Sequence, residues 1–289
     1  MKIFVTGGSG LLGSRIAEMA EGHEILATYN KNRADVDFPL VPLDIAIKED
    51  VDSTLDDFNP DAVIHTAALT NVDYCEDHRE EAMRINERGT RNLARACEKI
   101  GAMLIYVSTD FVFDGKKGLY TEEDKAHPIS HYGTSKLLGE EAAMECPNYA
   151  IARVSVLYGR TMHARGNFVT WVRGALKRCE KINIVTDQYT SPTYVDNAAE
   201  ALLAILEKRK KGIFHTSGGE RINRFYFAKK IADVFSLDET LINPITTEEL
   251  IQKAKRPKDS SLSIKKTERE LKIKMLKIEE GLKMMKDSK

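Results

Sequence analysis

The stretch TGGSGLLG occupies residues 6–13 and directly follows the apolar run KIFVT at residues 2–6. Gly7, Gly10 and Gly13 stand three residues apart, and a helical pattern follows them. Glycines between a strand and a helix permit a tight turn, let backbone N–H groups approach a pyrophosphate, and let the helix lie close to the sheet. A plain structural turn is the alternative. The stretch favours a dinucleotide site, formed by Gly7, Ser9, Gly10, Leu11, Leu12 and Gly13.

Short apolar runs alternate with longer amphipathic segments along the first half of the chain. The apolar runs are continuous, as in parallel strands that are covered on both faces. This order predicts an α/β fold: a doubly wound parallel (Rossmann) sheet, followed by a smaller mixed α/β C-terminal substrate lobe. We assign residues 1–158 and 186–216 to the sheet domain, and residues 159–185 and 217–289 to the lobe. The expected strands are KIFVT, EILAT, VPLD, AVIHT, MLIYVS and YAIARVSVLY. The helices expected between these strands span residues 11–21, 48–57, 79–99 and 132–145.

The end of the second expected strand indicates which dinucleotide binds. NAD-selective folds place an acid there to bind the ribose 2′-hydroxyl. In EILATYNKNR, residues 24–33, no acid appears before Asp35, whereas Lys31 and Arg33 offer cations to a 2′-phosphate. A solvated polar loop is the alternative, and the pattern favours NADP(H). Further cofactor contacts are expected from Asn30, from Asp44 and Ile45 after the third strand, and from Ala67, Ala68 and Leu69 after the fourth.

Tyr132 and Lys136 are four residues apart in HYGTSK, so they share one face of a helix. A phenol has a pKa of about 10, and a nearby ammonium stabilises the phenolate and lowers that pKa. Ser108 and Thr109 place hydroxyls where the fifth strand ends. Structural packing is the other interpretation of the pair. Together the residues suit hydride transfer to a carbonyl, with Tyr132 as the proton donor.

Composition narrows the class of protein. The chain has 289 residues, a formal net charge of −1, 42% hydrophobic residues and 30% charged residues. These values are typical of a globular protein and give no reason to expect nucleic acid as a partner. No apolar run is long enough to span a bilayer, and the N-terminal run MKIFVTGG lacks the pattern of a secretory signal. We therefore expect a cytoplasmic protein with no membrane partner.

The cysteines and histidines do not form a metal motif. Cys75, Cys97, Cys146 and Cys179 form no CxxC pair, and no histidines have the HExxH spacing. We expect the four cysteines to be packing residues. His65 ends an apolar run and is expected to be a hydrogen-bonded core residue. The sequence predicts no metal site.

Several motifs together resemble a known family. TGGSGLLG, the strand-end STD and YGTSK look like the extended short-chain dehydrogenase/reductases, and INERGTRNLARA places Asn86 at that family's helix asparagine, which holds a water in the proton path. STDFVFDG, YGTSKLLGEE, DQYTSPT and RPKDSSL resemble, more narrowly, the dTDP-4-dehydrorhamnose reductases. The resemblance implies reduction of a nucleotide-linked 4-keto-6-deoxy sugar by a homodimer. It implies catalytic roles for Thr109, Tyr132, Lys136 and Asn86, and cofactor contacts from Tyr132 and from Lys136, which can hold the nicotinamide ribose. It also implies substrate contacts from Thr109, Asp110, Asn167 and Arg256.

Two departures and two alternatives remain. Phe111 stands where the family usually has tyrosine, and Val156 stands where it often has tryptophan. GIFHTSGGE and IADVFSL also resemble the regulatory beta subunit of methionine adenosyltransferase, which binds NADP and an enzyme partner. A nucleotide-sugar epimerase that uses NAD is the other alternative. Residues 251–289 carry 13 Lys and Arg against 6 Asp and Glu, which form either solvated helix faces or a positive wall for an anionic substrate.

Overall fold

A parallel sheet forms the body of the molecule. The computed structural model describes residues 1–160 and 166–288. The strands of the sheet are β1 (Lys2–Thr6), β2 (Glu24–Tyr29), β3 (Leu40–Pro42), β4 (Ala62–His65), β5 (Met103–Thr109), β6 (Tyr149–Val154) and β11 (Gly212–His215). They are all parallel, in the order β11-β6-β5-β4-β1-β2-β3. The chain leaves β1 toward β2 and returns on the other side at β4, so the carboxyl ends of β1 and β4 flank the switch point where such sheets bind ligands.

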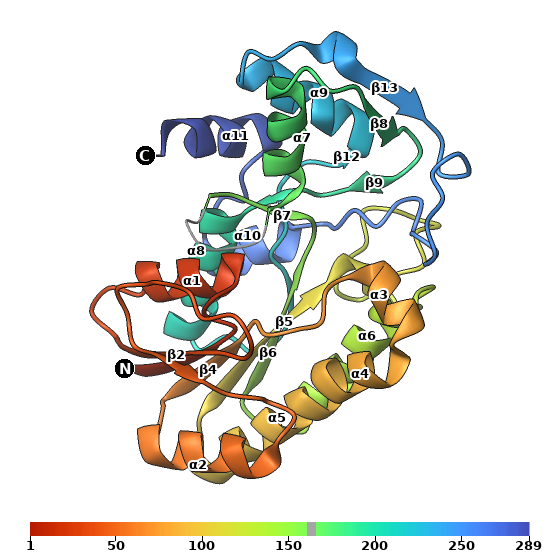
Figure 1. Cartoon of the computed structure of the whole chain (residues 1–289). Coiled ribbons are helices and arrows are strands. Elements are labelled where there is room, and N and C mark those ends of the chain that lie inside the picture. Colours follow the sequence, from red (N-terminus) through yellow and green to blue (C-terminus); the bar gives the residue numbers. More distant parts are fainter. Residues whose placement is uncertain (161–165, 289) are drawn as a thin grey trace.

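Helices cover both faces of this sheet (Figure 1). The helices α1 (Leu11–Met19), α8 (Val195–Glu207) and α10 (Lys265–Leu271) lie on one face, and α2 (Lys48–Phe58), α5 (Gly89–Ile100) and α6 (His131–Ala143) lie on the other. Adjacent strand residues point to opposite faces, since Ile3 and Val5 pack in the first core whereas Phe4 packs in the second. Burial on both faces explains why the strands read as continuous apolar runs, and it confirms the predicted doubly wound α/β fold.

One predicted helix is several elements. The expected helix over 79–99 becomes α4 (Arg79–Met83), a π-helical turn η1 (Arg84–Arg88) and α5, and the preceding α3 (Val72–Asp77) is separate. The π turn inserts an extra residue per turn and is common at functional sites. A short 3₁₀ turn, η2 (Asp110–Val112), directly follows β5.

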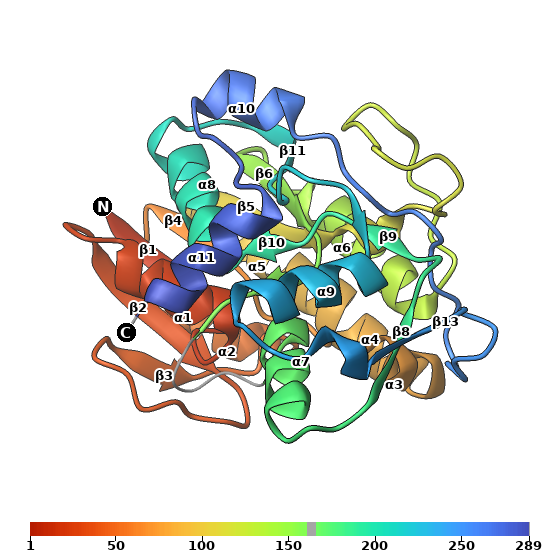
Figure 2. The same ribbon diagram turned by 90° about the horizontal axis from the view of Figure 1, so that it is seen from above.

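The second layer of the molecule is a small lobe above the carboxyl edge of the sheet (Figures 1 and 2). It has its own hydrophobic core, in which Phe227, Leu282 and Met285 are fully buried. The remaining elements are β7 (Leu157–Tyr158), α7 (Phe168–Lys177), β8 (Ile182–Val185), β9 (Tyr189–Thr190), β10 (Thr193–Tyr194), β12 (Ile222–Asn223), α9 (Arg224–Val234), η3 (Glu239–Leu241), β13 (Ile242–Ile245) and α11 (Ile278–Asp287).

Three other expectations differ from the structure. The run over 149–158 is two strands, because Val156 adopts a left-handed φ of 39° between β6 and β7. The helix α10, placed in the lobe by the predicted boundaries, contributes Leu271 to the core beneath α8. Cys179 is exposed and is not a packing residue, whereas Cys75, Cys97 and Cys146 are buried as expected.

A membrane-spanning helix and a metal site each place requirements on the geometry of the described residues. None of the helices there has both the length and the apolar character needed to cross a bilayer. Among the same residues, no group of three or more His, Cys, Asp or Glu side chains is arranged to hold a metal ion.

Candidate active site at the carboxyl edge of the sheet

The glycine turn joins β1 to α1 with very little space. Gly7 has a left-handed φ of 73°, and the Gly10 N–H donates to the Gly7 carbonyl at 2.8 Å. A Cβ on Gly13 would lie 2.2 Å from that carbonyl oxygen, and a Cβ on Gly7 would lie 2.9 Å from the backbone nitrogen of Ala67. Gly10 caps α1 without a side-chain hydrogen bond. The first N–H groups of α1 can therefore meet a pyrophosphate, so the turn fits a dinucleotide.

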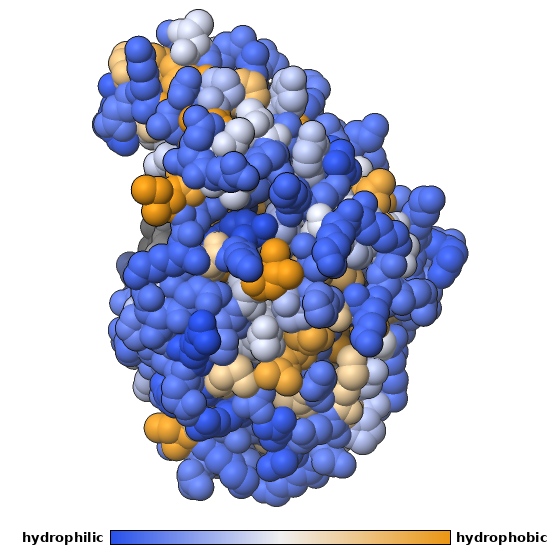
Figure 3. Space-filling model, turned by 90° about the vertical axis from the view of Figure 1, so that its right-hand side faces the viewer, coloured by the Kyte–Doolittle hydropathy of each residue, from blue (hydrophilic) through white to orange (hydrophobic). Residues whose placement is uncertain are grey.

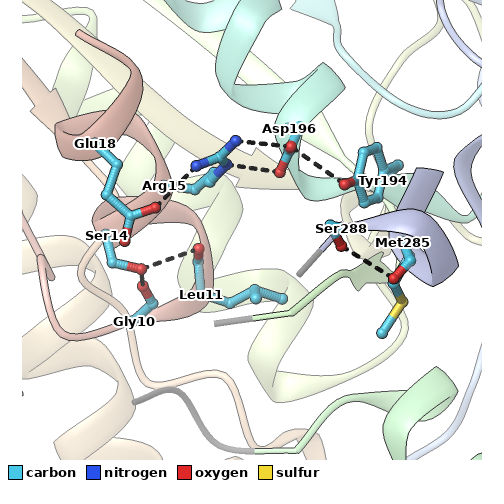
Figure 4. Close-up of polar contacts among 9 residues, drawn as sticks. All are labelled: Gly10, Leu11, Ser14, Arg15, Glu18, Tyr194, Asp196, Met285 and Ser288. Atoms are coloured by element: carbon cyan, nitrogen blue, oxygen red, sulfur yellow. Dashed lines mark hydrogen bonds and ion pairs between the residues drawn. The ribbon is translucent and has the colours of Figure 1, made fainter. Parts of the chain in front are cut away.

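Polar contacts hold α1 against α8 and the lobe (Figure 4). Arg15 binds both carboxylate oxygens of Asp196, at 2.8 and 2.9 Å, and the Tyr194 hydroxyl donates to Asp196 at 3.2 Å.

The predicted cofactor residues Ser9 and Leu12 in the glycine turn have different surroundings. Ser9 accepts a hydrogen bond from the Ala34 N–H at 3.2 Å, while the Leu12 side chain is buried in the core. Leu12 can offer a cofactor its backbone only.

The side chains predicted to select the cofactor lie at the end of β2. Asn30, Lys31 and Arg33 are all exposed, and the salt bridges among the described residues include neither cation. A free guanidinium presents a planar fork to a phosphate. The arrangement therefore fits a 2′-phosphate.

The other predicted cofactor residues surround the switch point. Asp44 binds Arg84 at 3.1 Å, and Ile45 is buried so tightly against α5 that a Cβ on Gly89 would lie 2.7 Å from it. Ala67, Ala68 and Leu69 follow β4 and are half-buried beside the glycine turn. The small side chains of Ala67 and Ala68 leave room for a cofactor to cross the sheet edge.

Tyr132 and Lys136 lie on the buried face of α6. Ser130 caps this helix by accepting a hydrogen bond from Gly133 N–H at 3.1 Å. Tyr132 is 8% exposed and packs edge-on against Phe111 at 5.9 Å between ring centroids. Lys136 is 3% exposed. The i, i+4 spacing thus places both side chains in the interior, beside the end of β5.

Burial dominates the titration of both groups. It raises the pKa of the Tyr132 phenol, and the hydrogen bond with the Thr109 side chain acts in the opposite direction. Burial lowers the pKa of Lys136 to about 7, against the opposing charge of Glu140. The Lys136 Nζ donates to the Val107 carbonyl at 2.8 Å. Burial therefore outweighs any lowering of the phenol's pKa by the ammonium in this conformation, and the effect of Lys136 on Tyr132 stays a prediction.

The two hydroxyls at the end of β5, on Ser108 and Thr109, have different hydrogen-bond partners. Thr109 lies beside Tyr132, and its Oγ1 donates to Asp110 at 3.2 Å while accepting from the Phe111 N–H at 3.2 Å. Ser108 instead donates to Glu140 at 2.5 Å in the interior. Thr109 is therefore the hydroxyl that can meet a substrate oxygen together with Tyr132.

Asp110, predicted to contact substrate, lies in a buried polar network. It accepts hydrogen bonds from Ser155 at 2.9 Å and Ser260 at 2.5 Å, and it is 2% exposed. Burial raises the pKa of this carboxyl, and the two serine hydroxyls oppose that change. The network joins the ends of β5 and β6 to the C-terminal segment, so Asp110 holds the two layers together at the site.

Asn86 lies in the π turn, where its side-chain amide and its backbone carbonyl both form hydrogen bonds. Its Oδ1 accepts from the Leu69 N–H at 2.8 Å, and its Nδ2 donates to the Leu69 carbonyl at 3.1 Å and to Ser135 at 2.9 Å. The Thr90 hydroxyl donates to the Asn86 carbonyl at 2.7 Å. The side chain ties the loop after β4 to α6, and its part in a proton path stays a prediction.

His65 is a buried core residue, as expected. Its Nδ1 lies 2.7 Å from the Thr6 hydroxyl and its Nε2 lies 3.1 Å from the Thr90 hydroxyl. Because Thr90 donates its own proton to Asn86, its oxygen is left to accept from Nε2–H, with Nδ1 as the acceptor. Burial lowers the pKa of His65, and the charge of Lys136 lowers it further, so the ring is neutral.

The last two predicted substrate residues make structural contacts. Asn167 caps α7: its Oδ1 accepts from Val169 and Thr170 N–H, and its Nδ2 donates to the Gly159 carbonyl at 2.8 Å. Arg256 binds both oxygens of Asp73, at 3.1 and 3.0 Å, with 11% of its side chain exposed. Contact of either residue with substrate stays a prediction.

A cavity of about 820 Å³ opens beside Arg256. Hydrophilic side chains cover most of the face of the molecule that Figure 3 shows. The cavity combines cations with a few carboxylates and one tyrosine. Its lining is Asp114, Gly115, Lys116, Ile129, Thr186, Asp187, Tyr189, Arg221, Thr247, Lys255, Arg256, Lys258 and Asp259. Five of these residues are Lys or Arg, so the cavity suits an anionic ligand.

Sequence reasoning missed two residues near the site. Glu140 and Arg153 form a buried ion pair directly behind Ser108 and Lys136. Glu140 stands four residues after Lys136, so its place on the same helix face was a usable signal. Nothing in the local sequence marks Arg153 as its partner, because it comes from β6.

Comparison with known proteins places this geometry in a family. The model of the RmlD substrate binding domain matches residues 1–289. The chain belongs to this family. It is 36% identical to the probable low-salt glycan biosynthesis reductase Agl14 of Haloferax volcanii, over 94% of this chain and 92% of that protein. It is 33% identical to methionine adenosyltransferase 2 subunit beta of Rattus norvegicus, over 92% of this chain and 81% of that protein.

A solved structure supports the same assignment. The dTDP-4-dehydrorhamnose reductase of Bacillus anthracis, determined in complex with NADP, superposes with a TM-score of 0.90 at 34% identity. The match covers 98% of both chains. The RmlD family member described here therefore shares its whole fold, sheet domain and lobe alike, with a reductase that binds NADP.

Proposed function

We propose that this RmlD family protein is an NADPH-dependent reductase of the 4-keto group of a nucleotide-linked 6-deoxy sugar, with dTDP-4-dehydrorhamnose the foremost substrate. The observation that carries the proposal is the buried placement of Tyr132 and Lys136 beside Thr109, at the sheet edge that bears the glycine turn. The likeness to a reductase structure over nearly the whole chain supports it.

In this proposal, three residues of the site have separate roles in the reduction. The cofactor supplies the hydride when bound. The Thr109 hydroxyl orients the keto oxygen, and the Tyr132 hydroxyl donates the proton to that oxygen as it gains negative charge. A phenol whose pKa is raised by burial is a protonated donor at neutral pH. Lys136 supplies positive charge behind the site, which stabilises the phenolate left after proton transfer.

The cationic cavity is the proposed place of the nucleotide end of the substrate. Arg256 lies in its wall with a guanidinium oriented by Asp73, and Lys255 and Lys258 flank it. A diphosphate carries the charge that this wall attracts, and a guanidinium binds its oxygens in pairs. The cavity is lined on one side by the positively charged C-terminal segment, with Lys255 and Lys258, and on another by the loop after β5, which contains Asp114.

Turnover measured with a panel of nucleotide 4-keto sugars tests the proposal. Purified protein is incubated with NADPH and each dTDP-, UDP- or GDP-linked 4-keto-6-deoxy sugar, and NADPH oxidation and product formation are followed together. We expect turnover of at least one sugar by the wild-type protein and loss of turnover in Tyr132→Phe. Absence of turnover on every sugar by a protein that binds NADPH would contradict the proposal.

A regulatory subunit is the second candidate. It is favoured by the 33% identity to methionine adenosyltransferase 2 subunit beta over 92% of this chain. A purified methionine adenosyltransferase catalytic subunit distinguishes the two. Tight binding together with changed kinetics of S-adenosylmethionine formation, without sugar turnover, would favour the regulatory role. The NAD-dependent epimerase is less well supported, since no acid stands at the end of β2.

A further inference from the structure

A buried ion pair lies directly behind the candidate active site. Glu140 on α6 accepts hydrogen bonds from Arg153 on β6, through Nε at 2.8 Å and Nη2 at 2.7 Å. The two side chains are 1% and 4% exposed. Arg153 also lies over the Phe113 ring, 5.1 Å from its centroid, and its Nη1 approaches His215 Nε2 at 3.4 Å. Packing and hydrogen bonds thus fix the pair in one geometry.

Such a pair is a poor source of stability. Removing two charges from water costs several kcal/mol per ion, and apolar replacements of similar volume are often neutral or stabilising. The pair is therefore better explained by what it holds in place. Glu140 Oε1 accepts the Ser108 hydroxyl at 2.5 Å, and Ser108 immediately precedes Thr109 on β5. The carboxylate thereby links α6 to the strand that carries the substrate-facing hydroxyl.

Glu140 also stands one helical turn from Lys136. Lys136 is confined by the Val107 carbonyl at 2.8 Å and by the Tyr106 ring, 4.1 Å from its centroid. Burial lowers the pKa of Lys136 to about 7, and the carboxylate of Glu140 opposes this change. Other charged or titratable groups near this site are Tyr132, neutral His65, Tyr106, Asp110, Arg153 and His215. Cys75 and Glu87 lie on helical elements packed against α6.

We propose that Glu140 is a positioning residue for this site: buried and oriented by Arg153, it fixes Ser108 at the end of β5 and supports the positive charge of Lys136 one helical turn away. Arg153 holds the carboxylate in place through its two hydrogen bonds. Glu140 and Arg153 touch neither substrate nor cofactor in this role. The proposal rests on the proposed function only in giving the charge of Lys136 a use.

The titration of Lys136 in the free protein tests the proposal directly. The ¹³Cε shift of Lys136, assigned with Lys136→Arg, is followed against pH by NMR. Because Glu140→Gln leaves a buried unpaired arginine, the double variant E140Q/R153M removes both charges and keeps the volume. We expect both folded variants to titrate Lys136 about one pH unit lower than wild type. Glu141→Gln, which removes an exposed charge from the neighbouring position, should leave the titration unchanged.

Activity gives the second readout. The alkaline limb of kcat against pH should move down by the same amount in E140Q/R153M, whereas R153M alone should not lower it. An unchanged Lys136 titration in the folded double variant would overturn the proposal. If the titration moves but no sugar is reduced by any form of the protein, the proposed function fails and the electrostatic role of Glu140 stands.

Discussion

Lys136 donates a hydrogen bond from its Nζ to the carbonyl oxygen of Val107, 2.8 Å away, so its ammonium is held against the carboxyl end of strand β5. A lysine in this position is buried at a cost, because water can no longer solvate its charge. Burial of this ammonium therefore lowers the stability of the folded protein, and it fixes a positive charge behind the reacting hydroxyls. Functional sites commonly carry such costs.

Lys136→Met should remove turnover while stabilising the protein at neutral pH. The pKa of Lys136 is about 7 in the folded chain and near 10.5 when unfolded, so between these values the unfolded chain binds the extra proton. Stability from this group therefore rises with pH across that window, by up to about 1.4 kcal/mol per pH unit. We expect the advantage of Lys136→Met to be largest at pH 6 and to shrink toward pH 9. Urea unfolding at several pH values measures this, with exposed Lys125→Met as the control.

Tyr132→Phe should remove nearly all reduction of a keto sugar while leaving NADPH binding intact. Phenylalanine keeps the ring that packs against Phe111, and only the proton donor is lost. Loss of a general acid costs about 100- to 10,000-fold in rate. Steady-state kinetics and NADPH fluorescence titration measure the two quantities separately. Near-normal turnover in this variant would show that another group protonates the substrate.

Arg33→Ala should weaken NADPH binding and leave NADH binding nearly unchanged. A hydrogen bond to a charged phosphate contributes about 1.5–3 kcal/mol, which corresponds to a factor of about 10 to 150 in affinity. Dissociation constants for both cofactors, measured by titration calorimetry, test this. Lys181→Ala, an exposed cation elsewhere on the surface, is the control. Equal loss for both cofactors would place Arg33 away from the 2′-phosphate.

Gly13→Ala should destabilise the sheet domain and abolish cofactor binding. The added Cβ would lie 2.2 Å from the Gly7 carbonyl oxygen, so β1 and α1 must separate. We expect a loss of about 1–3 kcal/mol in the free energy of unfolding, typical of overpacking. Gly174→Ala on α7 is the matched control, because its Cβ meets only the flexible end of Arg178 at 3.3 Å and should stabilise the helix slightly. A Gly13→Ala protein with wild-type stability and cofactor affinity would contradict this account.

The sequence predicted the sheet better than the site. β1 has the predicted bounds and α2 begins at the predicted residue, because a continuous apolar run and a strong helical period depend on local sequence alone. The break at Val156 was missed, since a β-branched residue rarely adopts a positive φ and nothing nearby marks it. The π turn that carries Asn86 was missed for a similar reason: its extra residue leaves the helical pattern nearly intact.

The roles of the polar site residues depended on distant partners. The family resemblance assigned Asp110 to substrate, but its hydrogen bonds come from Ser155 and Ser260, far along the chain. Sequence alone could not show that burial, rather than Lys136, sets the pKa of Tyr132. Motif spacing indicated that Tyr132 and Lys136 share a helix face, and the tertiary packing decided what each side chain contacts.

The pair formed by Arg256 and Asp73 yields the last prediction. Asp73 binds both terminal nitrogens of Arg256, and the Ala254 carbonyl accepts from one of them at 3.0 Å. The guanidinium is thus held rigidly at the cavity wall, and lysine cannot reproduce that two-point contact. We expect Arg256→Lys to weaken binding of dTDP to the enzyme–NADP complex about 10-fold, and Asp73→Asn to weaken it too by releasing the arginine. Lys255→Arg, which preserves charge at the neighbouring lining position, is the control. Calorimetry with dTDP, UDP and GDP measures the effect, and unchanged affinities in both variants would assign the pair to holding the C-terminal segment against α3 alone.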